Sequence, residues 1–219
     1  MVRQARSEAT RRRIITSAVD LFNEMGYPAT GLGDIIERAE MTKGALYYHF
    51  ESKESLATAI IEEGSANLFD AFRNICQSSA PALECVIHGV FVVADMLGTD
   101  SVARSGTQLM RAFAEFNDAA ARTYNGWLDE MSRRVADAID EGDLRSDLDP
   151  RAVSAVIVSA MIGAEVLASA TSSGADVLPR IAHVWDVLLP AVVAEESQSY
   201  FREFLARETM RHTATSAET

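Results

Sequence analysis

Apolar residues recur along almost the whole chain at three- and four-residue intervals, and this helical period limits the fold more than any other feature. No strand-like alternation of any length is visible, and the 219 residues include only five prolines. Gly26 stands where a left-handed cap would end the first helix. The expected fold class is all-α, with helices at about 5–25, 33–39, 43–49, 53–75, 82–97, 102–113, 117–142, 150–170, 177–194 and 200–210.

The net charge of −12 is unevenly distributed along the chain. Residues 1–56 contain eight Arg or Lys and eight Asp or Glu, so the whole net charge belongs to the rest of the chain. An acidic region is repelled by phosphate, whereas the neutral region has the Arg11-Arg12-Arg13 run and the only two lysines, Lys43 and Lys53. The arginine run is either a solvated helix face or a set of phosphate contacts.

The segment from Gly26 to Lys53 has the pattern of a helix–turn–helix, in which the second helix lies in the major groove and reads bases with its N-terminal residues. Leu46 and Phe50, four residues apart, can anchor the helix at 43–49 and leave its other residues to face DNA. Thr42 is the expected N-cap of this helix. The predicted DNA-contacting residues are Thr30, Thr42, Lys43, Gly44, Ala45, Tyr47, Tyr48, His49 and Lys53.

These residues suit different contacts with a duplex. Lys43 can donate to guanine, while Gly44 and Ala45 permit close approach and contact with a thymine methyl group. Hydroxyl, imidazole and ammonium groups can bind phosphate, and this role is expected for Tyr47, Tyr48, His49, Lys53 and Thr30. The alternative for either tyrosine alone is packing in the core.

No pattern in the chain indicates an enzyme. A glycine-rich phosphate loop, a nucleophile motif and a spaced set of metal ligands are all missing from the sequence, so neither a metal nor a cofactor is expected. Cys76 and Cys85 have no metal-binding or disulfide pattern and are expected to be reduced thiols. His88, on an apolar helix, is interpreted as a core residue.

The segment at 150–170 is apolar on nearly all sides, and a helix of that kind must be covered on all sides. Because another strongly apolar helix follows at 177–194, we expect a homodimer through these two helices, with Trp185 in the interface; the alternative is the core of a monomer. The uncharged run at 152–164 is too short to span a membrane, and the chain begins with a charged helix. A cytoplasmic protein without a membrane partner is expected.

Two sets of residues resemble known regulators. The pattern from Gly26-Tyr27 through Thr42-Lys43-Gly44-Ala45-Leu46-Tyr47-Tyr48-His49-Phe50 to Leu56 resembles the TetR family of one-component transcriptional repressors. Within that family the chain is most similar to the γ-butyrolactone autoregulator receptors of actinobacteria. That similarity comprises the start of the helix at 43–49, Tyr124-Asn125-Gly126-Trp127, Leu148-Asp149 and the region of Trp185.

The resemblance implies a three-helix DNA-binding head at 1–52, joined through the helix from residue 53 to a ligand-binding and dimerisation domain at 53–212, with a flexible tail at 213–219. A dimer of this kind would bind a palindromic operator, and a small-molecule effector would release it. Trp127 matches the tryptophan that lactone receptors place against their effector; the alternative is an ordinary core tryptophan on a helical stripe. The further expected ligand residues are Met110, Phe113, Phe91 and Met131, although such stripes usually form core.

The chain departs from the family pattern at two positions. Glu40 stands where the turn before the helix at 43–49 usually has glycine, and a left-handed Glu40 would cost on the order of 1 kcal/mol. Gly31 replaces a second hydroxyl residue after Thr30. The alternative function within the family is a repressor that responds to a lipophilic drug or metabolite and controls an efflux or catabolic gene. A small helical enzyme and a protein-interaction adaptor are the alternatives outside it.

Overall fold

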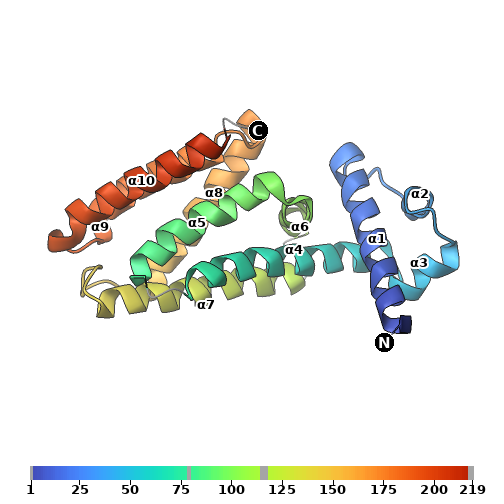
Figure 1. Ribbon diagram of the computed structural model, residues 1–219, viewed down its shortest axis with the longest axis horizontal. Helices are drawn as coiled ribbons and strands as arrows, with labels where there is room; N and C mark the ends of the chain where they lie inside the picture. The colour runs from blue at the N-terminus through green and yellow to red at the C-terminus, as the bar shows by residue number, and fades with distance from the viewer. Residues whose placement is uncertain (1, 78–79, 114–117, 217–219) are drawn as a thin grey trace. The chain divides into compact units, whose positions relative to one another are not determined.

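The computed structural model describes residues 2–77, 80–113 and 118–216, and every regular element in these ranges is a helix (Figure 1). This confirms the predicted all-α fold class. The elements are α1 (Val2–Met25), α2 (Leu32–Arg38), α3 (Lys43–His49), α4 (Lys53–Ile75), α5 (Ala82–Thr99), α6 (Ser101–Ala112), α7 (Asp118–Asp140), α8 (Pro150–Ser172), α9 (Val177–Val192), a short 3-10 helix η1 (Glu195–Ser197) and α10 (Gln198–Ser216).

The helix ends follow local chemistry. Gly26 has a φ of +83° directly after α1, so the predicted left-handed cap is confirmed. Asp149 caps α8, because its side chain accepts a hydrogen bond from the backbone N–H of Arg151 and Pro150 follows it at the first helical position. The last helix is longer than expected: α10 continues to Ser216, into the segment 213–219 that was expected to be a flexible tail.

The chain forms two compact units. The first comprises Met1–Leu68 and Thr99–Thr123, and the second comprises Phe69–Gly98 and Tyr124–Thr219. The first unit therefore contains α1 to α3, most of α4 and the whole of α6. The remaining helices form the second unit, apart from the ends of α5 and α7.

In the first unit, α6 packs against α1 and crosses α4 at very short range. A Cβ atom on Gly106 would lie 2.9 Å from the carbonyl oxygen of Ile60, and one on Gly64 would lie 2.6 Å from that of Val102. Glycine is therefore required at both positions of this crossing. The hydroxyl of Ser105 also donates to Oδ1 of Asn23 over 3.1 Å, which links α6 to α1.

The second unit has a continuous apolar core formed by the end of α4 and by α5, α7, α8, α9 and α10. Figure 1 shows α9 and α10 side by side, and α8 also packs against α9. Trp185 is fully buried in this core. The expectation that Trp185 lies in a dimer interface was therefore wrong, because the indole ring is covered by the chain's own helices.

Two helices in the described part of the chain, α5 and α8, are long and apolar enough to cross a membrane. The sequence argument from residues 152–164 underestimated the apolar length of α8, which spans Pro150–Ser172. Half of α5 is buried inside the protein, as expected of a core helix, whereas only 28% of the most apolar window of α8 is buried. The remaining exposed apolar surface of α8 needs another explanation.

Candidate nucleic-acid interface and effector region

The helix α3 begins at Thr42, which is its N-cap as predicted. The side-chain oxygen of Thr42 accepts a hydrogen bond from the backbone N–H of Ala45 over 3.2 Å. On the inner side of α3, Leu46 and the following Phe50 are 1% and 4% exposed, so the predicted pair of anchors is confirmed. These contacts fix the helix in the head and determine which of its residues face solvent.

The outer face of α3 contains Lys43, Gly44, Tyr47 and Tyr48, all exposed. Tyr48 is 76% exposed and Tyr47 43%, which excludes core packing for both. The ammonium of Lys43 lies 5.7 Å from the ring centroid of Tyr47, and among the described residues it makes no ion pair. This face therefore combines one available cation with two phenol groups, and it suits a polyanionic partner.

Gly44 lies at the centre of this face. A Cβ atom there would meet no atom of the protein within 4 Å, so internal packing does not require glycine at this position. The neighbouring Ala45 and His49 are half-buried, and the rings of His49 and Tyr48 meet edge-to-face with centroids 5.0 Å apart. Gly44 and Ala45 thus leave the first turn of α3 without large side chains, and the aromatic residues stand on its second turn.

Thr30 and Lys53 differ from their predicted roles. Thr30 is 1% exposed, and its hydroxyl donates to the carbonyl oxygens of Gly26 and Leu21 over 3.0 and 3.4 Å. The ammonium of Lys53 donates to the carbonyl oxygens of Tyr27 and Thr30, both over 2.8 Å, and lies 4.2 Å from the centroid of the Tyr27 ring. These loop carbonyls need donors inside the head, so both side chains stabilise the loop instead of facing a phosphate.

Two arginines of the run on α1 make ion pairs within the first unit. Arg13 pairs with Glu40 over 2.9 Å, and Arg11 pairs with Glu63 over 3.1 Å. Both pairs are partly or largely exposed and so contribute little to stability. Glu40 has a φ of +50°, so the strained conformation considered for the turn is present. The structure thus favours the solvated-face interpretation for Arg11 and Arg13.

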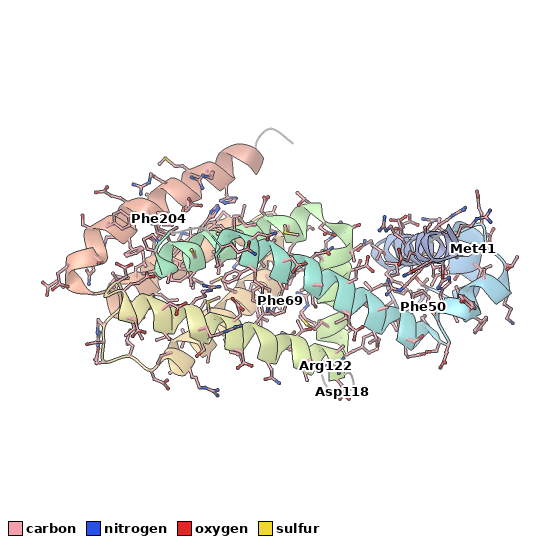
Figure 2. The ribbon with its side chains drawn as sticks, turned by 60° about the horizontal axis from the view of Figure 1, so that its bottom comes forward. Met41, Phe50, Phe69, Asp118, Arg122 and Phe204 are labelled. Carbon is pink, nitrogen blue, oxygen red and sulfur yellow. The ribbon has the colours of Figure 1, made fainter. Side chains whose placement is uncertain are left out.

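The candidate effector residue Trp127 lies in an aromatic group at the edge of the second unit's core. Its ring is stacked on Phe69, with centroids 4.1 Å apart and planes at 14°, and meets Phe72 edge-to-face at 5.6 Å. Figure 2 shows Phe69 on α4. The guanidinium of Arg73 lies 5.4 Å from the Phe69 centroid. Trp127 is only partly buried and remains able to contact a small apolar molecule.

Three of the other four predicted ligand residues are buried, and Phe113 is half-buried. Phe91 and Met131 are 0% and 2% exposed in the second unit, and Met110 is 7% exposed in the first. Phe113 packs edge-to-face on Tyr27, with ring centroids 4.8 Å apart. Phe91 and Met131 belong to the same apolar core against which Trp127 packs, so the core-packing alternative fits their burial, and their contact with an effector stays a prediction.

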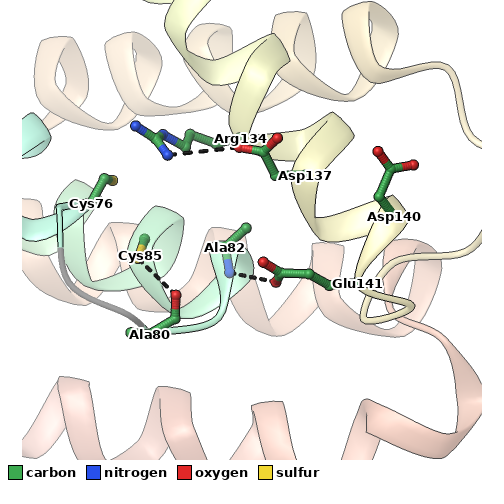
Figure 3. A pocket seen from close by; sticks show the side chains of 8 residues that line it. All are labelled: Cys76, Ala80, Ala82, Cys85, Arg134, Asp137, Asp140 and Glu141. Carbon is green, nitrogen blue, oxygen red and sulfur yellow. Dashed lines mark hydrogen bonds and ion pairs between the residues drawn. The ribbon is translucent and has the colours of Figure 1, made fainter.

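An open pocket of about 440 Å³ lies elsewhere in the second unit (Figure 3). None of the five predicted ligand residues lines it. Glu141 accepts a hydrogen bond from the backbone N–H of Ala82 here, and burial together with the neighbouring Cys85 raises the pKa of Cys76 to about 12. This pocket was not predicted from the sequence, although its charged residues have helical spacing along α7 and the residue that follows it. The lining residues are Cys76, Ala80, Ala82, Cys85, Arg134, Asp137, Asp140 and Glu141.

Known proteins share this architecture. The family model described as bacterial regulatory proteins of the tetR family matches residues 14–60, and the one described as a tetracyclin repressor-like C-terminal domain matches residues 80–194. The A-factor receptor protein of Streptomyces griseus is 30% identical over 192 residues, which are 88% of this chain and 67% of that protein.

Two solved structures are similar over nearly their whole length. A γ-butyrolactone receptor described as ArpA-like has a TM-score of 0.78 and 28% identity, and the match covers 94% of this chain and 99% of that one. CprB from Streptomyces coelicolor, solved in complex with its biological operator sequence, has a TM-score of 0.78 and 29% identity, with 93% and 98% covered. The similarity thus includes both the head and the larger helical region.

Proposed function

The chain belongs to the TetR family of bacterial transcriptional regulators, and we propose that it represses transcription as a homodimer that a γ-butyrolactone-type effector releases from a palindromic operator. Proteins of this family bind operator DNA and small molecules, and they are not enzymes. The observation that carries the proposal is the exposed face of α3, where Lys43, Gly44, Tyr47 and Tyr48 stand on a helix anchored by buried residues. The expected location is the cytoplasm, where operator DNA is found.

The proposed DNA-contacting residues all belong to α3 and its cap. We retain Thr42, Lys43, Gly44, Ala45, Tyr47, Tyr48 and His49, and leave out the two side chains that stabilise the loop of the head. Lys43 donates to a guanine, because it lies in the first turn of the helix that enters the groove. We keep residues 1–52 as the DNA-binding domain in this proposal, with the recognition helices of a dimer about 34–36 Å apart.

The proposed dimer interface covers the exposed face of α8 and part of α9. Val156 and Leu167 on α8 are 51% and 52% exposed in the single chain, and Val187 on α9 is 75% exposed. Exposed aliphatic residues on two helices that pack against each other are typical of a protein–protein interface. A second copy of the chain would cover this surface and would also provide the second α3 that a palindromic operator requires.

The proposed effector site is beside Trp127. Its indole ring offers a large apolar surface and one N–H donor, which suits a small molecule with an apolar tail and a carbonyl group. The similarity to γ-butyrolactone receptors along most of the chain supports a lactone as that molecule. The alternative effector is a lipophilic drug or metabolite, as in other regulators of the family.

Release of DNA requires a link between effector and head. In the first unit α6 contacts both α1 and α4 through the glycine crossing, the Ser105–Asn23 hydrogen bond and the Phe113–Tyr27 ring contact. A small displacement of α6 would therefore move α1 and, with it, the anchored α3. By linkage, the effector weakens operator binding as much as the operator weakens effector binding.

The experiment begins with operator fragments selected from random or genomic DNA by the purified protein. Synthetic γ-butyrolactones and a panel of lipophilic drugs are then tested for release in a mobility-shift assay. We expect a lactone to release the DNA at concentrations where the drugs are inactive. Release by a drug and not by a lactone would instead support a lipophilic drug or metabolite as the effector. Trp127→Ala should bind operator normally and lose the response; loss of both activities would instead make Trp127 a structural residue.

A further inference from the structure

Three side chains with metal-ligating atoms meet between α5 and α10 in the second unit. They are His88 on α5 and Glu208 and His212 on α10, and one ligand atom of each lies within 4.8 Å of the other two. Glu208 is 2% exposed and His212 8%, while the His88 side chain is 24% exposed. None of these residues belongs to the DNA-contacting face or to the aromatic group of Trp127.

The distances within the cluster are close to those of a coordination sphere. Nδ1 of His88 lies 2.6 Å from Oε2 of Glu208, and Nε2 of His212 lies 3.8 Å from the same oxygen. Zinc binds imidazole nitrogen and carboxylate oxygen at about 2.0–2.2 Å, so the ligand atoms of a tetrahedral site are about 3.3–3.5 Å apart. The observed separations lie on both sides of that range, and side-chain shifts of about one ångström would bring all three atoms to it.

Neighbouring side chains orient these ligands. The His212 ring is stacked on the fully buried Phe91, with centroids 5.5 Å apart and planes at 22°. Arg211 contacts the other carboxylate oxygen of Glu208, Oε1, over 2.8 Å and leaves Oε2 directed at the two imidazoles. Contacts of this kind, in which neighbouring side chains orient the metal-ligating residues, are typical of metal sites in proteins.

The positions of the residues along their helices also favour a shared site. Glu208 and His212 are four residues apart on α10, so their side chains lie on one face of the helix. On α5, Asp95 follows His88 by seven residues, or two turns, and its charge acts on His212. Three protein ligands leave a fourth position on a tetrahedral ion, which a water molecule can fill.

We propose that His88, Glu208 and His212 bind one divalent transition-metal ion of the zinc type, and that this ion fastens the C-terminal part of α10 to α5. Two imidazoles and one carboxylate form a donor set that suits zinc, cobalt or nickel better than magnesium or calcium. An ion held by both helices would stabilise the folded chain, because the unfolded chain does not bring these ligands together. The site would be independent of operator and effector binding.

The test uses Co²⁺ as a spectroscopic substitute for zinc. The full-length protein, freed of metal by a chelator, is titrated with Co²⁺ while visible absorption is recorded, and bound zinc is measured by elemental analysis after dialysis. We expect one ion per chain and a higher midpoint of thermal unfolding with metal. Because loss of an outer contact alone costs about 10–100-fold in metal affinity, His88→Ala and His212→Ala should each weaken binding at least that much.

Two further variants make the result decisive. Glu208→Gln keeps the volume and hydrogen-bonding capacity of the side chain, so it should fold while binding metal weakly. His183→Ala removes an exposed histidine on α9 and should bind metal like the unchanged chain. No stoichiometric uptake by folded protein, or equal uptake by the His88 and His212 variants, would overturn the proposal and leave the cluster as a hydrogen-bonded ion pair.

Discussion

The exposed face of α3 and the exposed face of α8 both lack a cover in the single chain, yet their chemistry differs. The α3 face presents an ammonium group and two phenol groups above small residues, whereas the α8 face presents valine, leucine and alanine. A polar, cationic face suits phosphate and base edges, and an aliphatic face suits another aliphatic face. Exposure alone therefore does not identify a function; the chemistry of the exposed atoms indicates which partner fits.

The largest effect should come from charge placed on the aliphatic face. Leu167→Glu combined with Val187→Glu would bury unpaired carboxylates in the proposed dimer, at a cost of several kcal/mol. We expect a monomer in analytical ultracentrifugation and operator binding weakened by more than about 100-fold, because one head alone makes half of the contacts.

A matched charge on the polar face of α3 should affect operator binding and not dimerisation. Tyr48→Glu places one carboxylate per chain on α3, where it should abolish operator binding and leave the dimer intact. If Tyr48→Glu became monomeric, the α3 face would belong to the dimer interface. If the α8–α9 double variant remained dimeric, the exposed faces of α8 and α9 would not form that interface.

The next largest effect is expected at Lys43. Its replacement by alanine should cost about 1–3 kcal/mol of operator binding and relax the preference at one base position. Selection of operators with the variant measures both effects. If the variant binds all DNA sequences equally more weakly, Lys43 contacts only a phosphate. In either case, added salt should steeply weaken DNA binding by the unchanged protein.

A smaller effect should separate stability from recognition at Gly44. Because a Cβ atom at this position meets no protein atom, Gly44→Ala should stabilise the free chain by up to about 1 kcal/mol through reduced backbone freedom. The added methyl group would nevertheless prevent the closest approach to a base pair, so operator affinity should fall. Thermal unfolding measures the stability of the variant, and a mobility-shift titration of the same preparation measures its operator affinity. A stabilised variant with normal affinity would show that α3 does not approach DNA at Gly44.

The sequence predicted the helices and the outer face of α3 well, because both depend on local period and spacing. Thr42 capped α3 as expected, and Leu46 and Phe50 anchored it. The sequence failed where a side chain had two plausible partners. Thr30 and Lys53 have groups that could bind phosphate, and only the folded loop shows that backbone carbonyls accept from them instead.

Contacts between distant segments were the other source of error. The burial of Trp185 depends on helices separated from it along the chain, so the spacing of α9 could not distinguish a core from an interface. His88 and the pair on α10 are more than a hundred residues apart, and no sequence spacing relates them. Glu208 and His212 are four residues apart, but this spacing alone indicates only a shared helix face.

The smallest expected effect is on the reactivity of Cys76. Cys76 and Cys85 line the pocket of the second unit, and unlike the residues of the two exposed faces both are buried. Burial and the neighbouring thiol raise the pKa of Cys76 from 9.0 to about 12, so the folded state favours the protonated thiol. Its contribution to stability is complete below about pH 9, where both states are protonated, and is lost as the pH rises toward 12. Since the thiolate is the nucleophile, Cys76 should react with a disulfide reagent at pH 8 far more slowly in the folded protein than in urea. The absorbance of the thiol released from the reagent measures this rate, and Cys85→Ser leaves Cys76 as the only cysteine. Rapid reaction in the folded state would mean that the Cys76 thiol is accessible to solvent and readily deprotonated.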